Sequence, residues 1–358
     1  MEHILWFDQH DPAHEPVLGG KNTSLGILTR AGLPVPPGFG LSALAFRKVF
    51  ADAGLPSQLN ALLSTVDTND TAALVRAARA ARDLICSLSL PQWLCSELDR
   101  AYELLAARCA IPDVPVAVRS SATCEDSPDA SFAGEHDTYL WIRGADEVRR
   151  HVLACWASLF TERAIAYRRQ LGYRDDAVAM SVGVQQMVLP RAAGVAFTLN
   201  PIDGDRSQVA IDASWGLGET VVSGSVTPDN FVVDKVLWEI TRRTISSKVV
   251  EHRLGPEGRV IEAEVEPARR DVACLTDAEV KAVARLARRA EKHYGRPQDV
   301  EWASDPGRPD GDMVVLLQSR PETVWSKQTR TSKSGTTDVY RSIVASLLHP
   351  HNGRTNPG

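Results

Sequence analysis

The sequence lacks the segments that would direct a protein into or across a membrane. Its N-terminal stretch, MEHILWFDQHDPAHEP, has no basic region followed by a long apolar run, which is the pattern of a secretory signal. No segment approaches the roughly 20 apolar residues that a membrane-spanning helix needs. We therefore expect a cytoplasmic protein.

An excess of basic charge is also missing. The formal net charge is −5 and the pI is near 6.0, and no basic stretch dominates the sequence. This composition argues against non-specific binding to nucleic acid or to acidic membranes.

The cysteines show neither a C-x-x-C spacing nor a nearby histidine cluster. The six are Cys86, Cys95, Cys109, Cys124, Cys155 and Cys274. Reduced, mostly buried thiols are therefore predicted, in place of a disulfide framework or a metal site. Cys124 lies in a polar loop without a paired base, so no catalytic thiol is expected.

A P-loop is absent as well. The chain has Glu15 and Asn22 where that pattern requires a glycine and a Ser or Thr. Two glycines nevertheless precede Lys21, at the start of a predicted helical stretch over residues 23–31, and this arrangement suits a bound phosphate. A solvated lysine after a turn is the alternative interpretation of the same residues.

The chain has enough apolar sequence for a full core. With 358 residues, 44% apolar and 24% charged, it has room for one large two-lobed domain or two smaller ones. Apolar spacing and end signals predict further helices over residues 42–53, over two segments between 72 and 110 separated by Pro91, over 146–171 and over 276–294. Residues 326–358 have few apolar side chains and are expected to form a mobile tail.

A polar loop over residues 120–137 separates two predicted strands. It is rich in serine, glycine and acidic residues, and Arg119 at its base presents a permanently charged fork that suits phosphate. Long loops in compact domains are usually functional or disordered. We interpret this loop as a phosphate-covering lid that is mobile without ligand, and a plain surface loop is the alternative.

The predicted strand over residues 178–188 alternates small and large side chains. Ser181 and Gly183 share one face with Gln185, so this face leaves space for a ligand into which Gln185 would project. Alternatively, the neighbouring Gln186 would face the ligand, or Gln185 would be an ordinary sheet-edge glutamine.

Two more core strands are predicted over residues 194–199 and 208–214. They lead into the sequence WGLGE at residues 215–219. Its glycines suit a close approach of the backbone to a ligand, and they equally suit an ordinary turn.

The last predicted element is a hairpin of strands 298–303 and 313–320. A tight turn with proline at its second position would set polar side chains opposite each other. The pairs are Glu301 with Gln318 and Asp299 with Arg320. Carboxylate and amide oxygens suit Mg²⁺, which typically keeps few protein ligands, whereas a surface ion pair is the alternative for Asp299 and Arg320.

Several motifs along residues 4–326 occur in the order known from one family of ATP-binding domains. They are GGKNTSLGIL, RSSAT, SPDASFAGEHDTYL, GVQQMV, ASWGLGETVVSGSVTPD, EKHYGRP, DVEWA and LLQSRPETVWS. Together they resemble the N-terminal domain of the phosphoenolpyruvate synthase (pyruvate, water dikinase) family. Related domains occur in pyruvate phosphate dikinase and rifampin phosphotransferase.

The resemblance implies an α+β, ATP-grasp-like domain over residues 1–325. Antiparallel sheets with flanking helices would form two lobes, divided near residues 186–194, that hold ATP and Mg²⁺. It assigns Lys21 and Arg119 to the phosphates, Gly134 and Thr138 to the closing lid, Gln185 to the base side, Glu301 and Gln318 to Mg²⁺, Asp299 to the support of the metal, and Arg320 to the charge on the transferring group. Lys21, Arg119 and Arg320 would be the catalytic residues.

In the family, this domain passes a pyrophosphoryl group to a histidine on a separate swivelling domain. That histidine lies in a short Thr-His motif, and no Thr-His pair occurs in this sequence; the family's pyruvate-binding barrel is missing too. Three hypotheses follow: an ATP-binding subunit with a separately encoded phosphohistidine domain, the corresponding module of an antibiotic phosphotransferase, or a stand-alone or degenerate nucleotide binder.

Overall fold

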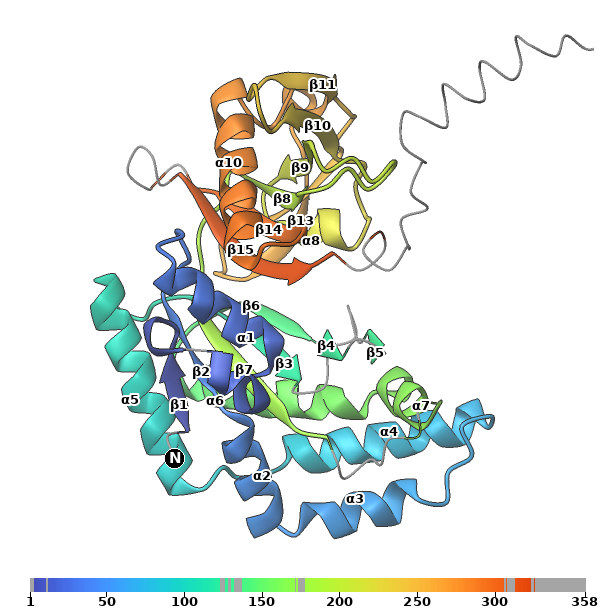
Figure 1. Ribbon diagram of the computed structural model, residues 1–358. Helices are drawn as coiled ribbons and strands as arrows, with labels where there is room; N and C mark the ends of the chain where they lie inside the picture. The colour runs from blue at the N-terminus through green and yellow to red at the C-terminus, as the bar shows by residue number, and fades with distance from the viewer. Residues whose placement is uncertain are drawn as a thin grey trace, which may run out of the picture. The chain divides into compact units, whose positions relative to one another are not determined.

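A computed structural model describes residues 3–10, 12–122, 126–127, 130–131, 137–170, 172, 178–305, 307, 313–322 and 325. Met1–Pro321 form one compact unit, which contains two antiparallel sheets and flanking helices (Figure 1). This arrangement confirms the predicted α+β class. None of the described helices combines the length and the apolar character that a membrane span requires.

The first sheet has the strand order β1-β2-β7-β3-β6, and every neighbouring pair is antiparallel. Its strands are β1 Ile4–Trp6, β2 Gly38–Leu41, β7 Met180–Gln186, β3 Val116–Ala122 and β6 Thr138–Ile142. Large apolar side chains such as Phe39, Val118 and Val184 point to one face and form a core with helices there. Burial of this face holds the helices on the sheet.

The helices on that core are largely those expected from the sequence. They are α2 Ala43–Asp52, α3 Leu55–Leu63, α4 Thr71–Cys86, α5 Gln92–Cys109, α6 Ala145–Ala157 and α7 Glu162–Gln170. The single helix predicted over residues 146–171 was wrong: the buried turn Ser158–Phe160 ends α6, and Thr161 Oγ1 accepts a hydrogen bond from Ala164 N to start α7. Helix α3 was not predicted.

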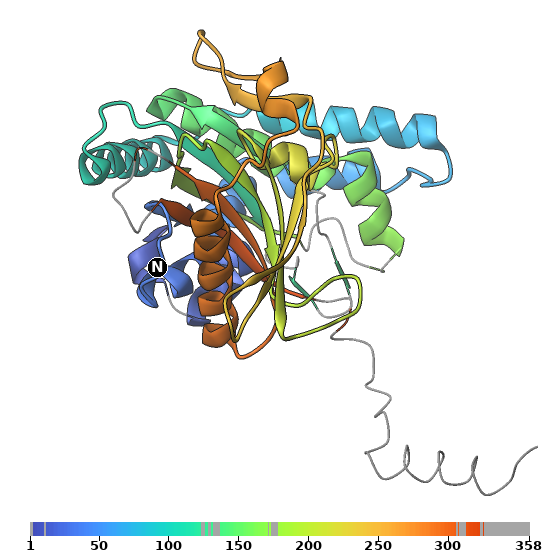
Figure 2. The same ribbon diagram turned by 90° about the horizontal axis from the view of Figure 1, so that it is seen from above.

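The second sheet has the strand order β11-β10-β9-β8-β14-β15, again antiparallel throughout. Its strands are β8 Ala192–Phe197, β9 Gln208–Trp215, β10 Asp229–Asp234, β11 Ile240–Thr244, β14 Gln298–Ser304 and β15 Val314–Pro321. Helix α10, Asp277–Tyr294, lies along one face (Figure 2). Side chains of α10 such as Val283 and Ala287 pack there against Ile211 and Trp302.

Helix α10 begins and ends where the sequence predicted. Thr276 Oγ1 accepts from Glu279 N at 3.3 Å, and the Glu279 carboxylate accepts from Thr276 N at 2.8 Å, which together form a capping box. Gly295 follows with φ +65°, the left-handed conformation that ends many helices.

Shorter elements complete the described chain. They are the hairpin of β12 Val250–Leu254 and β13 Val260–Glu264, the short pair of β4 Asp126–Ser127 and β5 Ala130–Ser131, the helices α8 Glu219–Val222 and α9 Pro267–Arg270, and 3-10 turns at Phe7–Gln9 and Pro12–His14. The β12–β13 hairpin was not predicted, because that stretch is polar and half exposed.

Helix α1, Glu15–Arg30, contacts both sheets. Leu18 lies on the first sheet opposite Gly40, whereas Leu25 and Leu28 belong to the core of α10 and the second sheet. The helix is longer than the predicted stretch 23–31, because it continues through a bend at Gly19. The glycines and the lysine singled out from the sequence are therefore part of α1.

Candidate functional site

The bend in α1 lies directly before Lys21. Gly19 has φ +67° and sits so close to β3 that a Cβ there would lie 2.6 Å from Ser121 Oγ, which leaves room only for glycine. Ser121 Oγ donates to Leu18 O at 2.8 Å and accepts from Asn22 N at 3.4 Å. The bend thus begins a new helical turn at Lys21, against the strand that leads into the predicted lid.

The small face of β7 is covered by α1, so the prediction of open ligand space there was wrong at two positions. Asn22 Nδ2 donates to Ser181 Oγ at 2.9 Å, and a Cβ at Gly183 would collide with Asn22 Oδ1. These small residues make room for a helix. Gln185, further along the strand, is 2% exposed, and its Nε2 donates to Pro36 O at 3.4 Å; its assignment to the base side stays a prediction.

Arg119 reaches from the first sheet to the second. It lies in β3 opposite the exposed Thr138 of β6, and its Nη1 donates to Leu317 O at 3.3 Å. Burial lowers the pKa of Arg119, an effect that the nearby Glu301 carboxylate opposes. Arg119 Nε is buried and has no hydrogen-bond partner among the described residues. The guanidinium therefore keeps an unused donor beside a carboxylate.

Glu301 and Gln318 face each other across β14 and β15, as predicted. Both side chains are half-buried and lie on the face of the sheet opposite α10. Within the described residues, neither side chain makes a hydrogen bond. Their oxygens therefore keep acceptor sites that water or an external ligand can occupy.

Asp299 and Arg320 are paired one step along the same face. The register sets them opposite each other, as predicted, and Arg320 Nε lies 3.5 Å from Asp299 Oδ2. Arg320 is 50% exposed whereas Asp299 is 17% exposed. Half of the Arg320 side chain is thus accessible despite the ion pair. This exposure is compatible with both ligand binding and a surface ion pair.

The glycine-rich sequence at residues 215–219 folds over this same face. A Cβ at Gly218 would lie 3.5 Å from Ala193 Cβ, and Ala193 alternates with Val195, the partner of Glu301 in β8. The loop is held by His252, whose O accepts from Leu217 N at 2.9 Å. His252 Nδ1 also lies 3.1 Å from Glu219 Oε2. This geometry favours the ligand-adjacent interpretation of these glycines.

Sequence reasoning missed two polar residues on this face. Asp212 of β9 pairs with Val195, so it shares a face with Glu301, and Asn230 Nδ2 donates to Asp212 Oδ1 at 2.7 Å. The signal was the alternation in the sequence QVAIDASW, which turns Asp212 away from the α10 core.

Several predicted features fall outside the described residues. They are Gly134 with most of the lid, Cys124, the turn at residues 308–311 and the tail 326–358. The strands that flank the lid are β3 and β6, as predicted. Of the cysteines, five are free thiols within the described part of the chain.

The donor set suits a hard divalent cation that keeps few protein ligands. No group of three or more His, Cys, Asp and Glu residues is placed to hold a metal in the described parts of the chain. Glu301 contributes a carboxylate and Gln318 an amide oxygen, and neither is hydrogen-bonded to a side chain or backbone group that the structure describes. Mg²⁺ commonly binds one or two carboxylates and takes its other ligands from phosphate oxygens and water, so the residues present fit Mg²⁺ bound together with a nucleotide.

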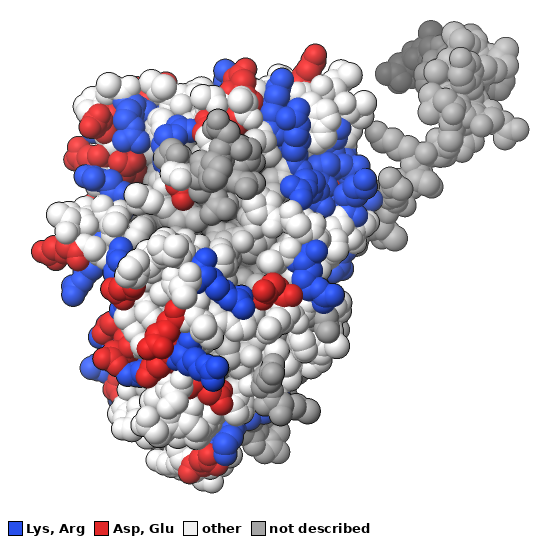
Figure 3. All heavy atoms as spheres, turned by 90° about the vertical axis from the view of Figure 1, so that its left-hand side faces the viewer, with Lys and Arg blue, Asp and Glu red and all other residues white. Residues whose placement is uncertain are grey.

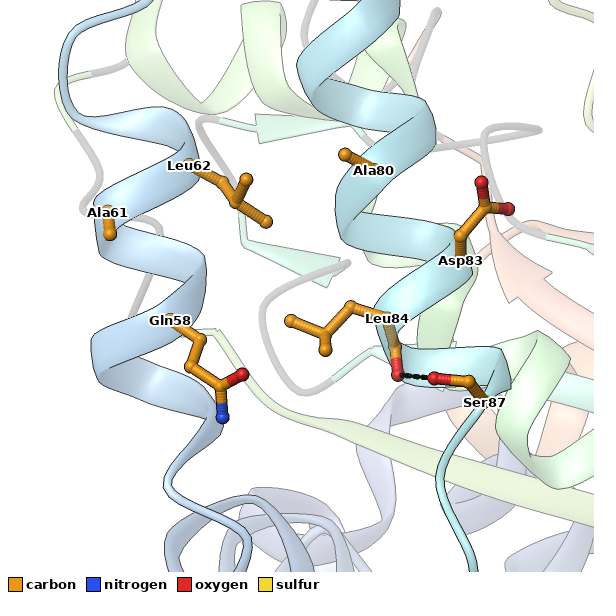
Figure 4. A pocket seen from close by; sticks show the side chains of 7 residues that line it. All are labelled: Gln58, Ala61, Leu62, Ala80, Asp83, Leu84 and Ser87. Atoms are coloured by element: carbon orange, nitrogen blue, oxygen red, sulfur yellow. Dashed lines mark hydrogen bonds between the residues drawn. The ribbon is translucent and has the colours of Figure 1, made fainter.

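A separate cavity of about 680 Å³ lies between α3 and α4. Figure 4 shows that its lining is largely apolar, with Leu62 and Leu84 pointing into it. None of the predicted site residues lines this cavity. On the face drawn in Figure 3, basic and acidic side chains are interspersed over much of the surface, with a denser basic group toward the top of the view.

Comparison with known families decides what the chain is. Residues 15–339 match the family model described as "Pyruvate phosphate dikinase, AMP/ATP-binding domain". The chain belongs to this family. The matched region includes every residue that the sequence assigned to the site.

Phosphoenolpyruvate synthases, which the sequence motifs resemble, are among the proteins similar to this chain. The chain is 41% identical over 96% of its length to a probable phosphoenolpyruvate synthase of Methanocaldococcus jannaschii and 42% identical over 93% to that of Methanothermobacter thermautotrophicus. It is 37% identical over 96% to the phosphoenolpyruvate synthase of Pyrococcus furiosus. The chain spans 28%, 48% and 46% of these relatives, respectively.

Proposed function

We propose that this ATP-binding domain holds Mg·ATP and transfers a phosphoryl or pyrophosphoryl group from it to a histidine on a separate domain or protein. The nucleotide domain would comprise residues 1–325, with lobes that meet near residues 186–194. The observation that carries the proposal is the pair Glu301 and Gln318, half-buried beside Arg119 yet without a side-chain hydrogen bond to any described residue.

The protein's part in such a reaction is positioning and charge stabilisation. Lys21 and Arg119 would hold phosphate oxygens, and Thr138 and Gly134 would close the lid over the nucleotide. Glu301 and Gln318 would hold Mg²⁺ with the support of Asp299. Arg320 would stabilise negative charge that develops on the transferring group.

Bound Mg²⁺ would supply charge neutralisation at the phosphate oxygens. Arg119 would add fixed positive charge, because a guanidinium stays protonated even where burial lowers its pKa. Its buried Nε has no partner among the described residues, so a phosphate oxygen would give this donor its acceptor. Gln185 would contact the base side of the nucleotide.

The proposal also names the acceptor of the transferred group, a histidine on another domain. The chain spans less than half of the compared relatives. We test the acceptor with a family swivelling domain supplied as a separate protein. With that domain and Mg·ATP, we expect pyrophosphoryl transfer to the histidine to release AMP, and water then to split the intermediate into phosphohistidine and free phosphate. The chain alone should release very little AMP.

Substitution of Arg320 tests the assignment of the charge-stabilising group. Arg320→Ala should lower the rate of transfer by about 10² to 10³, as found when single stabilising donors are removed elsewhere, while ATP affinity changes less. Arg76→Ala on the exposed face of α4 is the matched control and should leave the rate unchanged.

The identity of the product separates the competing functions. Steady ADP release by the chain alone, insensitive to Arg320→Ala, would refute a dikinase mechanism. Transfer to the histidine domain that continues to an antibiotic would favour the antibiotic phosphotransferase, and ATP binding without any turnover would favour a stand-alone nucleotide binder.

A further inference from the structure

A chain of hydroxyl groups joins α1 to the hairpin that carries the predicted metal ligands. Ser24 Oγ donates to Ser319 O at 3.0 Å, and Tyr294 OH lies 2.8 Å from Ser24 Oγ. A serine has one hydroxyl hydrogen, and a carbonyl oxygen only accepts. Ser24 Oγ therefore donates its hydrogen to Ser319 O, and Tyr294 OH donates to Ser24 Oγ.

Ser319 occupies a critical place in β15. It lies between Gln318 and Arg320, and its side chain points to the other face. Its own Oγ donates to Gln298 Oε1 at 2.9 Å, and Gln298 is the neighbour of Asp299 in β14. The contact with Ser24 thus fixes the hairpin backbone between the residues assigned to Mg²⁺ and to charge stabilisation.

Ser24 follows Lys21 by one turn of α1. Three residues of helix rise about 4.5 Å, so the position of Ser24 determines where Lys21 lies along the helix axis. The turn of α1 that follows the bend at Gly19 is fixed to the first sheet through Asn22, which donates to Ser181. The Tyr294–Ser24–Ser319 chain therefore sets α1, and Lys21 with it, against the second sheet.

Other contacts fix the same junction without touching the predicted site. Leu316 N donates to Pro34 O at 2.9 Å, and Arg289 Nη2 donates to Gly32 O at 2.8 Å. The junction would persist without the tyrosine hydroxyl, so Tyr294 is not required to hold α1 on the sheet. Burial raises the pKa of Tyr294, which keeps the phenol protonated and able to donate.

We propose that Tyr294 is a positioning residue, whose hydroxyl acts through Ser24 to set the separation between Lys21 and the Gln318 and Arg320 side chains. This inference rests on the proposed function, in which Lys21, Gln318 and Arg320 all act on the phosphates of one bound ATP molecule. A small change in that separation affects the transfer step more than ATP affinity, because misplacement by about 1 Å can cost about 10²-fold in rate.

Removal of the hydroxyl alone tests the proposal. In Tyr294→Phe, with the histidine domain supplied in trans, we expect kcat to fall about tenfold while KM for ATP stays within about twofold. Ser24→Ala should have a similar effect. Because both residues act through one chain of hydrogen bonds, the double variant should be no slower than Ser24→Ala alone.

Tyr102→Phe is the matched control. The Tyr102 hydroxyl is 2.8 Å from Val114 O and 2.9 Å from Asp113 Oδ1, and it accepts from Gly144 N at 2.9 Å, but it lies on α5 under the first sheet. This variant should lose at least as much stability as Tyr294→Phe without a change in kcat. If Tyr102→Phe and Tyr294→Phe lower kcat equally, or if Tyr294→Phe leaves kcat unchanged, Tyr294 has no positioning role.

A second measurement does not depend on turnover. Calorimetry gives the factor by which ATP tightens Mn²⁺ binding, which reports how well the nucleotide and metal positions match. We expect this factor to fall in Tyr294→Phe while the affinity for Mn²⁺ alone is unchanged, and an unaltered factor would overturn the proposal.

The two measurements also separate this proposal from the proposed function. If ATP tightens Mn²⁺ binding to the wild-type protein but no phosphate is transferred, the transfer reaction is refuted. The change of that tightening factor in Tyr294→Phe then still tests the role of Tyr294. Wild-type protein that binds no ATP would refute both.

Discussion

The two faces of the β14–β15 hairpin differ in how their side chains are satisfied. Toward α10, Val300, Trp302 and Leu316 are fully buried in the second core. On the other face, Glu301 and Gln318 are half-buried polar groups that bond to none of the described residues. The strands are the same, so the contrast comes from what each face meets: helix α10 covers one face, whereas the other carries these polar groups, which we propose bind a ligand.

This contrast predicts that stability and ligand binding are separable on a single pair of strands. A substitution on the α10 face should lower the free energy of unfolding and spare the binding of ATP by the folded fraction. A substitution on the opposite face should do the reverse. The variants below test that separation, from the largest expected effect to the smallest.

Trp302→Ala should cause the largest loss of stability. Trp302 has no exposed surface, and truncation of a buried tryptophan costs about 3–5 kcal/mol. Urea unfolding measures the change. Calorimetry at a temperature where the variant is folded should give an ATP affinity close to that of the wild type; loss of ATP binding by folded protein would show that the two faces are coupled.

Glu301→Gln should affect binding instead of stability. Loss of the carboxylate should weaken Mg²⁺-dependent ATP binding by about 10²-fold, since even an outer partner of a metal ligand contributes about 10- to 100-fold. The free energy of unfolding should change by less than about 0.5 kcal/mol. Glu103→Gln on the exposed face of α5 is the control, and equal ATP binding by both variants would contradict the assignment of Glu301.

Arg119→Met should separate the two properties most clearly. The guanidinium is desolvated and its Nε is without a partner in the described structure, so an apolar side chain of similar length should lower the free energy of unfolding by no more than about 1–2 kcal/mol, for the lost bond to Leu317 O. ATP affinity should fall about 10- to 100-fold, since a hydrogen bond to a charged group contributes about 1.5–3 kcal/mol. A strongly destabilised variant would mean that Arg119 is primarily structural.

The smallest expected effect is the pH dependence of stability that comes from His10, whose side chain packs against α1. The imidazole is fully buried, with Nδ1 3.0 Å from Asn22 O and Nε2 2.8 Å from Leu5 O, and burial lowers its pKa below the ordinary 6.5. The unfolded chain therefore binds a proton more readily, so stability is retained above pH 6.5 and decreases as the pH falls below it. The slope is at most about 1.4 kcal/mol per pH unit for one proton.

The pH dependence is measured by urea unfolding across pH 5 to pH 7. His10→Gln cannot titrate in this range but can still donate to one of the two carbonyl oxygens. Its stability should vary less with pH than that of the wild type. The same slope in both proteins would show that other groups govern the dependence.

The sequence predicted those parts of the site that follow from local pattern. Strand alternation placed Glu301 opposite Gln318 and Asp299 opposite Arg320, but the bulge between these pairs and the turn was not predicted: Trp302 pairs with Leu316 instead of Leu317. The capping box of Thr276 and Glu279 likewise fixed the start of α10. Neither inference required knowledge of distant segments.

The errors arose where distant segments meet. The small residues of β7 were interpreted as ligand space because the sequence does not show that Asn22, far away in the chain, packs against them. The helix over residues 146–171 was predicted as continuous because its apolar spacing continues across the buried turn at Ser158–Phe160. The contact of Ser24 with Tyr294 spans the chain from α1 to α10 and has no signature in either local sequence.

The β-bulge in the hairpin limits how its length can vary. Glu301 pairs with Gln318, but the next residue, Trp302, pairs with Leu316, so Leu317 is the extra residue of β15. Its carbonyl is thereby available to Arg119 of the first sheet, and Leu316 returns to the α10 face beside Trp302. Deletion of Leu317 would remove this acceptor and turn a leucine out of the core. We therefore expect related sequences to keep the number of residues here, with an apolar side chain at this position because Leu317 packs against Ala303 and Val315.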